Sequence, residues 1–211
     1  PKPRFSPVAR FVRTAESLDS LPAAEMVRTA PTGSARCGVF SRVQNSQMSV
    51  GALAAPMAMA FAVDREEPDA VIHLGDHAED AREIERVFPA MPICRVRGNN
   101  DFDPEVPLNA VVTPGGVRIY ITHGHRERVG MLSSGIVSQR AYEEHCALAF
   151  FGHTHRMMLE RENGVWVCNP GSISLPRGGP ASYARLTIEN GRATLLELVD
   201  EDGSLLRKES L

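Results

Sequence analysis

Short apolar runs alternate with stretches of helical periodicity along most of the chain. The apolar runs have the length of strands buried on both faces of a sheet, and they lie at 37–40, 70–74, 93–96 and 147–151. Apolar residues recur at helical spacing within 50–63, 78–88 and 137–146. Gly51 and Pro56 weaken the first of these predicted helices. The alternation predicts an α/β fold.

Toward the C-terminus the pattern changes to successive strands. Strand-like segments at 164–168, 183–188 and 193–199 are accompanied by the turn signals Asn163-Gly164 and Asn190-Gly191. An earlier pair, 111–112 and 117–122, flanks Pro114-Gly115-Gly116 and predicts a hairpin. We therefore expect an antiparallel meander at the end of the chain and mixed sheets overall.

The length suits one folded domain preceded by an extension. The chain has 211 residues, 43% of them hydrophobic, which is enough for one substantial core. Residues 1–36 contain scattered Pro, Ser and Arg with only a weak helical stripe, and we expect them to be poorly ordered. The predicted domain therefore spans residues 37–211.

Charge and cysteine usage narrow the range of partners. The formal net charge is -3, which argues against a broad attraction to nucleic acid or to anionic membranes. No apolar run is long enough for a membrane-spanning helix. The four cysteines are far apart and lie in or beside apolar runs, so we expect buried thiols in a reduced, cytoplasmic protein. The sequence leaves a homo-oligomer open.

Metal-competent side chains follow several of the predicted buried strands. They occur in the motifs Gly75-Asp76, Gly98-Asn99-Asn100-Asp101, His123-Gly124-His125 and Gly152-His153-Thr154-His155. In open α/β sheets, ligands bind beyond the carboxyl ends of the strands, and glycine lets the backbone turn sharply there. Each motif alone is weak, because a strand-end Asp is often a turn or helix cap. Together they predict a divalent-metal site formed by Asp76, Asn99, His123, His153 and His155.

The ligand types indicate which metals suit this site. Oxygen donors with several imidazoles favour Mn²⁺, Fe²⁺ or Zn²⁺ over Ca²⁺, and the lack of thiolates argues against a structural zinc site. Two such ions ~3.5–4 Å apart could hold a phosphoryl group and activate a water molecule, with Asp76 as the bridge. We assign His73 to the core as a buried neutral histidine, and His77 and His145 to the surface or to a supporting role.

The order of these motifs, followed by Asn169-Pro-Gly-Ser-Ile-Ser-Leu-Pro-Arg-Gly-Gly179, resembles the calcineurin-like metallophosphoesterase superfamily and its small YfcE-type phosphodiesterase group. The resemblance covers about residues 37–199. It implies a four-layer α/β/β/α sandwich with two mixed sheets and a metal site at strand-end loops. It also implies hydrolysis of a small phosphodiester by metal-activated water, with one or two ions, Mn²⁺ first and Fe²⁺, Zn²⁺, Ni²⁺ or Mg²⁺ as alternatives.

The resemblance also implies roles for individual residues. Asp76 would bridge two ions, and Asn99, His123 and His153 would complete the shell of one of them. His155 would belong to the other ion, together with a D-x-H motif after the first strand. Arg42 and Gln44 stand where that Asp and His are expected.

Three explanations of this departure stay open. Residues 42–57 could contain a sequence error, the chain could be a one-metal enzyme in which Arg42 neutralises phosphate charge, or it could be an inactive binding module that keeps at most one ion.

Two further expectations concern residues near the motifs. Asn100 stands where related enzymes carry a residue that contacts the leaving group, so leaving-group protonation would fall to solvent or to His125, the candidate catalytic residue. Basic residues near the motifs are expected to guide phosphate rather than to form a nucleic-acid groove; they are Arg126, Arg128, Arg156 and Arg177.

Overall fold

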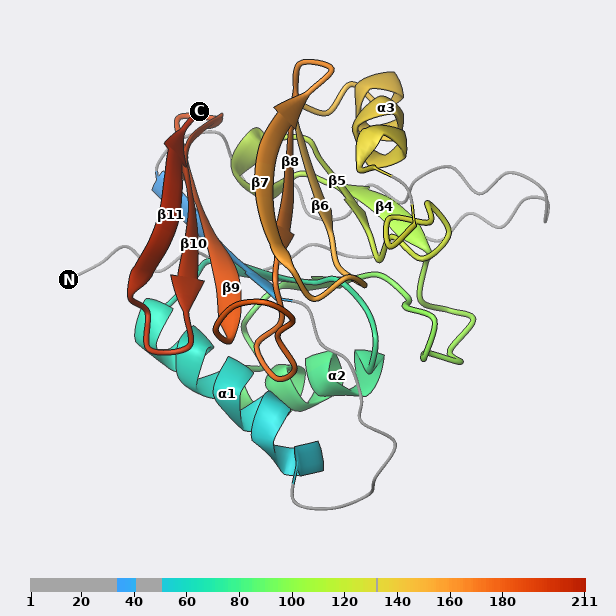
Figure 1. The fold of residues 1–211 in the computed structure, drawn as a ribbon. Coiled ribbons are helices and arrows are strands. Elements are labelled where there is room, and N and C mark those ends of the chain that lie inside the picture. The colour runs from blue at the N-terminus through green and yellow to red at the C-terminus, as the bar shows by residue number, and fades with distance from the viewer. Residues whose placement is uncertain (1–33, 41–50, 132) are drawn as a thin grey trace.

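The computed structural model describes residues 34–40, 51–131 and 133–211, and within these ranges the strands form two sheets (Figure 1). The first sheet has the order β11-β10-β9-β1-β2-β3, with β1 Ser34–Phe40, β2 Ala70–His73, β3 Ile93–Arg95, β9 Ser182–Glu189, β10 Arg192–Asp200 and β11 Leu205–Ser210. The second has the order β4-β5-β6-β8-β7, with β4 Asn109–Val112, β5 Ile119–Thr122, β6 Leu148–Phe151, β7 Met157–Glu162 and β8 Val165–Pro170.

Both sheets mix parallel and antiparallel pairs. In the first sheet β1, β2 and β3 are parallel, while β9 and β10 join them through antiparallel pairs. In the second sheet β5, β6 and β8 are parallel, and β4 and β7 are antiparallel edge strands. The parallel strands β2, β5 and β6 are buried at every position, which explains their continuous apolar sequences.

Helices cover the outer face of each sheet. Helices α1 Gly51–Glu66 and α2 Ala78–Val87 cover the first sheet, and α3 Gly135–Glu143 covers the second (Figure 1). A central core that includes Ile72, Phe150 and Leu186 fills the space between the sheets. Separate clusters lie beneath α1 and α2 and beneath α3. The predicted four-layer α/β/β/α sandwich with two mixed sheets is confirmed.

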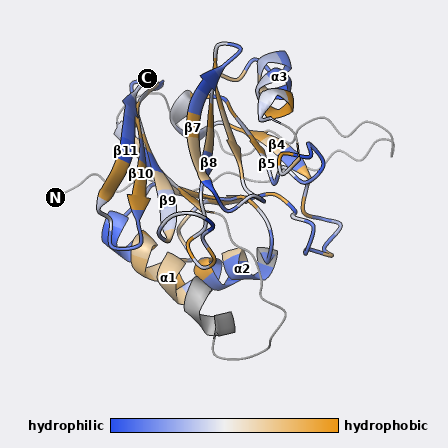
Figure 2. Ribbon diagram, in the orientation of Figure 1, coloured by the Kyte–Doolittle hydropathy of each residue, from blue (hydrophilic) through white to orange (hydrophobic). Residues whose placement is uncertain are grey.

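Helix α1 forms despite the residues that weaken it. Pro56 lies within the helix, where its missing N–H removes one backbone hydrogen bond. Met59, Ala62 and Val63 are buried against the first sheet, and Figure 2 shows the middle of the helix as predominantly hydrophobic. Packing on the sheet therefore compensates for the weak local propensity.

The predicted C-terminal meander is confirmed for the antiparallel pair of β9 and β10, but it is wrong for β8, which lies in the other sheet. The turn Asn163-Gly164 joins β7 to β8 in the second sheet, whereas Asn190-Gly191 joins β9 to β10 in the first. Each turn was read correctly, but β8 pairs with β6 in parallel rather than with β9. A turn sequence determines only the strand pair that it joins, and the sheet in which that pair lies is decided by long-range packing.

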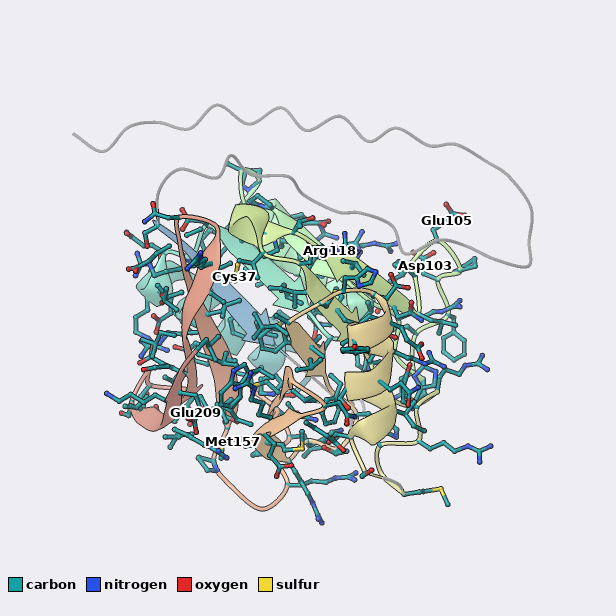
Figure 3. All side chains as sticks on the ribbon, turned by 90° about the horizontal axis from the view of Figure 1, so that it is seen from above. Cys37, Asp103, Glu105, Arg118, Met157 and Glu209 are labelled. Carbon is teal, nitrogen blue, oxygen red and sulfur yellow. The ribbon has the colours of Figure 1, made fainter. Side chains whose placement is uncertain are left out.

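Two strands were missed because they do not have a buried-strand pattern. β7 reads MMLERE, and β11 reads LLRKES with exposed residues at most positions. Both are edge strands, in which charged residues are common. Figure 3 shows Glu209 of β11 on the opposite side of the molecule from Asp103 and Glu105, which lie on the loop after β3.

Other predictions concern the ends of the domain, the cysteines and membrane segments. β1 begins at Ser34, slightly before the predicted boundary at 37. The segment with Arg42 and Gln44, and nearly all of the predicted extension 1–36, lie outside the described residues. All four cysteines are free and buried, as predicted. In the described ranges no helix has the length and apolar character needed to cross a bilayer.

Candidate metal centre

The predicted ligands lie on loops that leave the carboxyl ends of strands in both sheets. Asp76 follows β2 and Asn99 follows β3 in the first sheet. His123 follows β5, and His153 follows β6 in the second sheet. The site therefore sits where the two sheets meet along one rim, with donors from both sides of the sandwich.

Glycines let the two loops of the first sheet come into contact. A Cβ placed on Gly98 would lie 2.1 Å from Asp76 Oδ1 and 2.4 Å from the Asp76 nitrogen. Gly75 has φ +86°, and a Cβ there would lie 2.6 Å from the Gly98 nitrogen. No larger residue fits at either position without moving backbone atoms. These glycines allow the Asn100 N–H to donate to Asp76 Oδ1 at 3.0 Å.

Asp101 and His73 each accept a hydrogen bond from a backbone N–H of these two loops. The Gly98 N–H donates to Asp101 Oδ2 at 2.8 Å, so this carboxylate orients the loop after β3. His73 is 1% exposed, and its Nδ1 accepts from the Gly75 N–H at 3.3 Å. Its predicted place in the core is confirmed. His145 is exposed, whereas His77 is half-buried at the start of α2.

His123 lies at the centre of the site, with its ring fully buried. Its Nδ1–H donates to the Leu74 carbonyl at 2.7 Å, since a carbonyl oxygen can only accept. In the neutral ring, Nε2 then carries a lone pair. Nε2 lies 3.2 Å from Asn99 Oδ1 and 3.4 Å from Asp76 Oδ2.

Lone pairs on nitrogen and oxygen thus face one another across a small space. A carboxylate, an amide oxygen and an imidazole nitrogen that share this space repel one another unless a cation lies between them. Fixing the distal Nδ1–H on a backbone carbonyl is also how proteins orient a metal-binding histidine. The donor set of Asp76, Asn99 and His123 therefore fits a divalent ion.

Two further imidazoles border this donor set. The His153 ring centroid lies 5.2 Å from that of His123, and the His125 centroid lies 5.4 Å from it. His125 Nδ1 is buried and has no hydrogen-bond partner among the described residues. Within the described ranges, His, Cys, Asp and Glu alone form no group of three that could hold a metal ion. The candidate metal site therefore needs the Asn99 amide oxygen as one of its ligands.

His155 is placed differently from the other predicted ligands. It is 2% exposed, and its Nδ1 lies 3.0 Å from the Leu175 carbonyl on the loop after β8. The Arg177 N–H donates to the His155 carbonyl at 2.9 Å. No hydrogen bond or ion pair joins His155 to the other predicted ligands in the described part of the chain. The structure brings Asp76, Asn99, His123 and His153 together and leaves His155 beside them.

The protonation states suit metal binding. Burial raises the pKa of Asp76, but the neighbouring His123 and His153 rings and the hydrogen bond from the Asn100 N–H outweigh it, so the pKa is lowered overall. Burial, followed by the charge of Arg177, lowers the pKa of His155 to about 4. Burial also lowers the pKa of His153. At neutral pH the Asp76 carboxylate is therefore ionised and the His153 and His155 rings are neutral, which are the forms that coordinate metals.

Sequence reasoning missed residues that hold the site loops in place. Asn169 donates from Nδ2 to the Gly152 carbonyl at 2.7 Å and to Thr154 Oγ1 at 3.0 Å, which fixes the loop after β6. Glu127 is 1% exposed although it lies between Arg126 and Arg128. The signal for Asn169 was present in the motif of residues 169–179. Glu127 gave no signal, because a run of charges usually lies in solvent.

Comparison with known proteins supports the family that the order of the sequence motifs resembles. A family model described as the calcineurin-like phosphoesterase superfamily domain matches residues 51–191. "Probable metallophosphoesterase YsnB" of Bacillus subtilis is 37% identical over 131 residues, which are 61% of this chain and 74% of that protein. "Phosphodiesterase YfcE" of Escherichia coli K12 is 34% identical over 121 residues, 53% of this chain and 60% of that protein.

A solved structure with low sequence identity has the same fold. Vacuolar Protein Sorting 29 from Cryptosporidium parvum is 19% identical and has a TM-score of 0.65, covering 85% of this chain and 100% of that one. The family match begins at Gly51, after the segment that carries Arg42 and Gln44. With a family model that matches residues 51–191, the chain belongs to the calcineurin-like phosphoesterase superfamily, whose members include metallophosphoesterases.

Proposed function

We propose that the chain is a metal-dependent phosphodiesterase whose complete metal site is formed by Asp76, Asn99, His123 and His153. The observation that carries this proposal is the lone pair of His123 Nε2 facing the oxygens of Asp76 and Asn99. Mn²⁺ is the metal that we propose, with Fe²⁺, Zn²⁺, Ni²⁺ and Mg²⁺ as alternatives. A divalent ion held there supplies Lewis acidity toward a phosphoryl oxygen and makes a water molecule more acidic.

The chain's own residues supply orientation and charge. The Leu74 carbonyl fixes the His123 ring, and the Asn100 N–H fixes the Asp76 carboxylate. His155, held by the Leu175 carbonyl, is available to a second ion. The partner residues expected for that ion fall at Arg42 and Gln44, outside the described residues. We propose one firmly held ion and a second, weaker position.

His125 is proposed to contact the leaving group. Burial and the neighbouring His123 lower its pKa to about 4, so its ring is neutral at neutral pH. A neutral imidazole is a hydrogen-bond partner rather than a strong proton donor. The site should therefore prefer small phosphodiesters with good leaving groups over unactivated monoesters.

A second candidate function is an inactive or weakly active binding module. The missing D-x-H motif favours it, because Arg42 and Gln44 cannot replace an aspartate and a histidine as metal ligands. The likeness in fold to Vacuolar Protein Sorting 29 is compatible with a protein partner. This candidate predicts no turnover with any divalent ion.

Turnover of bis(p-nitrophenyl) phosphate with added Mn²⁺ tests the proposal. We expect release of p-nitrophenol that falls at least about 100-fold in Asp76→Ala and in His153→Ala, because each loses a metal ligand. His145→Ala, which removes an exposed histidine elsewhere, should keep wild-type activity. Absence of turnover with every divalent ion would contradict the proposed phosphodiesterase activity.

A further inference from the structure

The loop that follows β5 carries His123 and His125 and then turns back on itself. The Arg128 N–H donates to the His125 carbonyl at 3.3 Å, and the Val129 N–H donates to the Gly124 carbonyl at 3.3 Å. Gly130 follows, and a Cβ added to it would lie 4.0 Å from the His153 ring. The path of this loop therefore sets the positions of two site histidines and borders a third.

One side chain connects the inside of this loop to the sheet and to helix α3. Glu127 Oε2 accepts from Thr122 Oγ1 at 3.2 Å, and Thr122 is the residue directly before His123. Glu127 Oε1 accepts from Arg140 Nη1 of α3 at 2.9 Å. The Glu127 side chain is only 1% exposed, so its carboxylate relies on the Thr122 hydroxyl and the Arg140 guanidinium as hydrogen-bond donors in place of water.

Burial of this carboxylate has an energetic cost that surface packing would avoid. A glutamate between two arginines could lie in solvent, where it would keep its hydration. Here Glu127 is buried, whereas Arg140 stays 43% exposed and lines a pocket of about 220 Å³ with Asn109, Tyr120 and Glu143. Glu127 therefore loses its hydration, whereas Arg140 stays partly in solvent. The hydrogen bonds of Glu127 fix the loop in one position.

We propose that Glu127 is a positioning residue: it holds His123 and His125 in the metal site by tying their loop to Thr122 and to Arg140 of α3. The inference rests on the proposed metal-dependent function and adds the element that holds its ligands. Helix α3 thereby stabilises the site loop through the ion pair between Arg140 and Glu127. Glu127 itself touches no reacting atom.

The test compares Glu127→Ala and Glu127→Gln with Glu66→Ala, all in the full chain. Glu66 is a matched control, because it also pairs with arginine and is largely buried, but lies at the end of α1. We expect Glu127→Ala to weaken Mn²⁺ binding, measured by calorimetry, by about 10-fold or more. Glu127→Gln keeps an oxygen for Arg140 and should stay within about twofold of wild type, and Glu66→Ala should leave Mn²⁺ binding unchanged.

A second measurement does not require metal or turnover. The imidazole NMR resonances of His123 and His125 should shift in Glu127→Ala and in Arg140→Met, while those of the exposed His145 stay in place. Arg140→Met keeps most of the side-chain volume, so it serves if Glu127→Ala does not fold. Folded variants with unchanged His123 and His125 resonances would overturn the proposal.

The two proposals fail separately. A wild-type protein that binds no Mn²⁺ and hydrolyses no diester contradicts the proposed function, and the histidine resonances still decide the role of Glu127. Conversely, an active wild type whose Mn²⁺ affinity is the same in folded Glu127→Ala contradicts the positioning role alone. An equal loss in Glu127→Ala and Glu66→Ala would also contradict it, because that pattern indicates general destabilisation.

Discussion

At the scale of single residues, the approach of Gly98 to Asp76 leaves no room for a side chain. A Cβ at Gly98 would lie 2.1 Å from Asp76 Oδ1 and 2.4 Å from the backbone nitrogen of Asp76. We expect Gly98→Ala to displace the Asp76 loop, to abolish measurable Mn²⁺ binding and to lower stability by roughly 1–3 kcal/mol through overpacking. Calorimetry and urea denaturation measure the two effects.

Gly130→Ala is the matched control for this prediction. Gly130 is also a loop glycine beside the site, but an added Cβ would meet only the His153 ring, at 4.0 Å. It should change stability by less than about 0.5 kcal/mol, as do most substitutions away from special features. Equal behaviour of the two variants would refute the argument from close approach.

Glu66 lies at the end of α1 and accepts hydrogen bonds from two residues of β9. Tyr183 donates to its Oε1 at 2.5 Å and Arg185 donates to its Oε2 at 3.1 Å. Burial raises the pKa of Glu66, but these hydrogen bonds outweigh it and lower the pKa overall. The folded state therefore binds the proton more weakly than the unfolded state does, and Glu66 stabilises the fold above its unfolded pKa of about 4.3.

This contribution should be lost as the pH falls through the lowered pKa of the folded state. We expect Glu66→Gln to be less stable than wild type by about 1–2 kcal/mol at pH 7, and the difference to vanish in acid. Urea denaturation at several pH values measures it. Glu83→Gln removes an exposed i,i+3 pair with Arg86 and should show no such pH dependence.

At the scale of elements, the hairpin between β9 and β10 depends on its turn. Asn190 has φ +51° and Gly191 has φ +74°, which is the left-handed pair that favours Asn-Gly. A Cβ at Gly191 would meet only the Gly115 carbonyl, at 3.8 Å, so Gly191→Ala would be strained by its backbone alone. We expect a loss of about 1–2 kcal/mol, measured by urea denaturation.

Asn190→Gly provides the opposite test at the neighbouring position. Glycine adopts the same conformation without strain, so this variant should stay within about 0.5 kcal/mol of wild type. A larger loss in Asn190→Gly than in Gly191→Ala would mean that side-chain contacts, and not backbone conformation, stabilise the turn.

Elements with a strong local signal were predictable from the sequence, and those decided by packing were not. Strand β2 was predicted because every residue is buried, and the β4–β5 hairpin because Pro114 and Gly115 break the chain between apolar runs. The assignment of β8 to the sheet of β6 required knowledge of long-range pairing. Edge strand β11 was missed because it is exposed at nearly every position and carries charged residues, so it has no buried-strand pattern.

The candidate site could be predicted further than its supports. Asp76, Asn99, His123 and His153 follow buried strands, so their convergence follows from the carboxyl ends of the strands lying along one rim. His155 shares a motif with His153, yet its ring is held by Leu175 on another loop. Glu127 could not be found, because nothing in its neighbouring sequence distinguishes a buried carboxylate from an exposed one.

At the scale of the whole molecule, both sheets share one interior. Phe150 of β6 is fully buried in the core that also contains Ile72 and Leu186 of the other sheet. We expect Phe150→Ala to cost about 3–5 kcal/mol because it leaves a cavity between the sheets. Because both sheets contact this cavity, circular dichroism and tryptophan fluorescence should report one coincident unfolding transition.

Phe61→Ala is the control for the effect of removing a phenyl ring. Phe61 is 63% exposed on α1, so its loss should cost less than about 0.5 kcal/mol. Two separate transitions in Phe150→Ala would show that each sheet with its helices is stable without the other.

The buried thiols have a consequence for following the dynamics of each half of the sandwich. Cys37 and Cys94 lie in the first sheet, while Cys146 and Cys168 lie in or next to the second. Burial raises the pKa of Cys37 to about 12 and that of Cys94 to about 11, and it also raises the pKa of Cys146 and Cys168.

Since the thiolate is the reactive form, these cysteines should resist alkylation until the surrounding strands open. Iodoacetamide labelling followed by peptide mass spectrometry would then give an opening rate for each sheet from residues the protein already contains. The four buried cysteines therefore serve as intrinsic probes of local unfolding in each sheet.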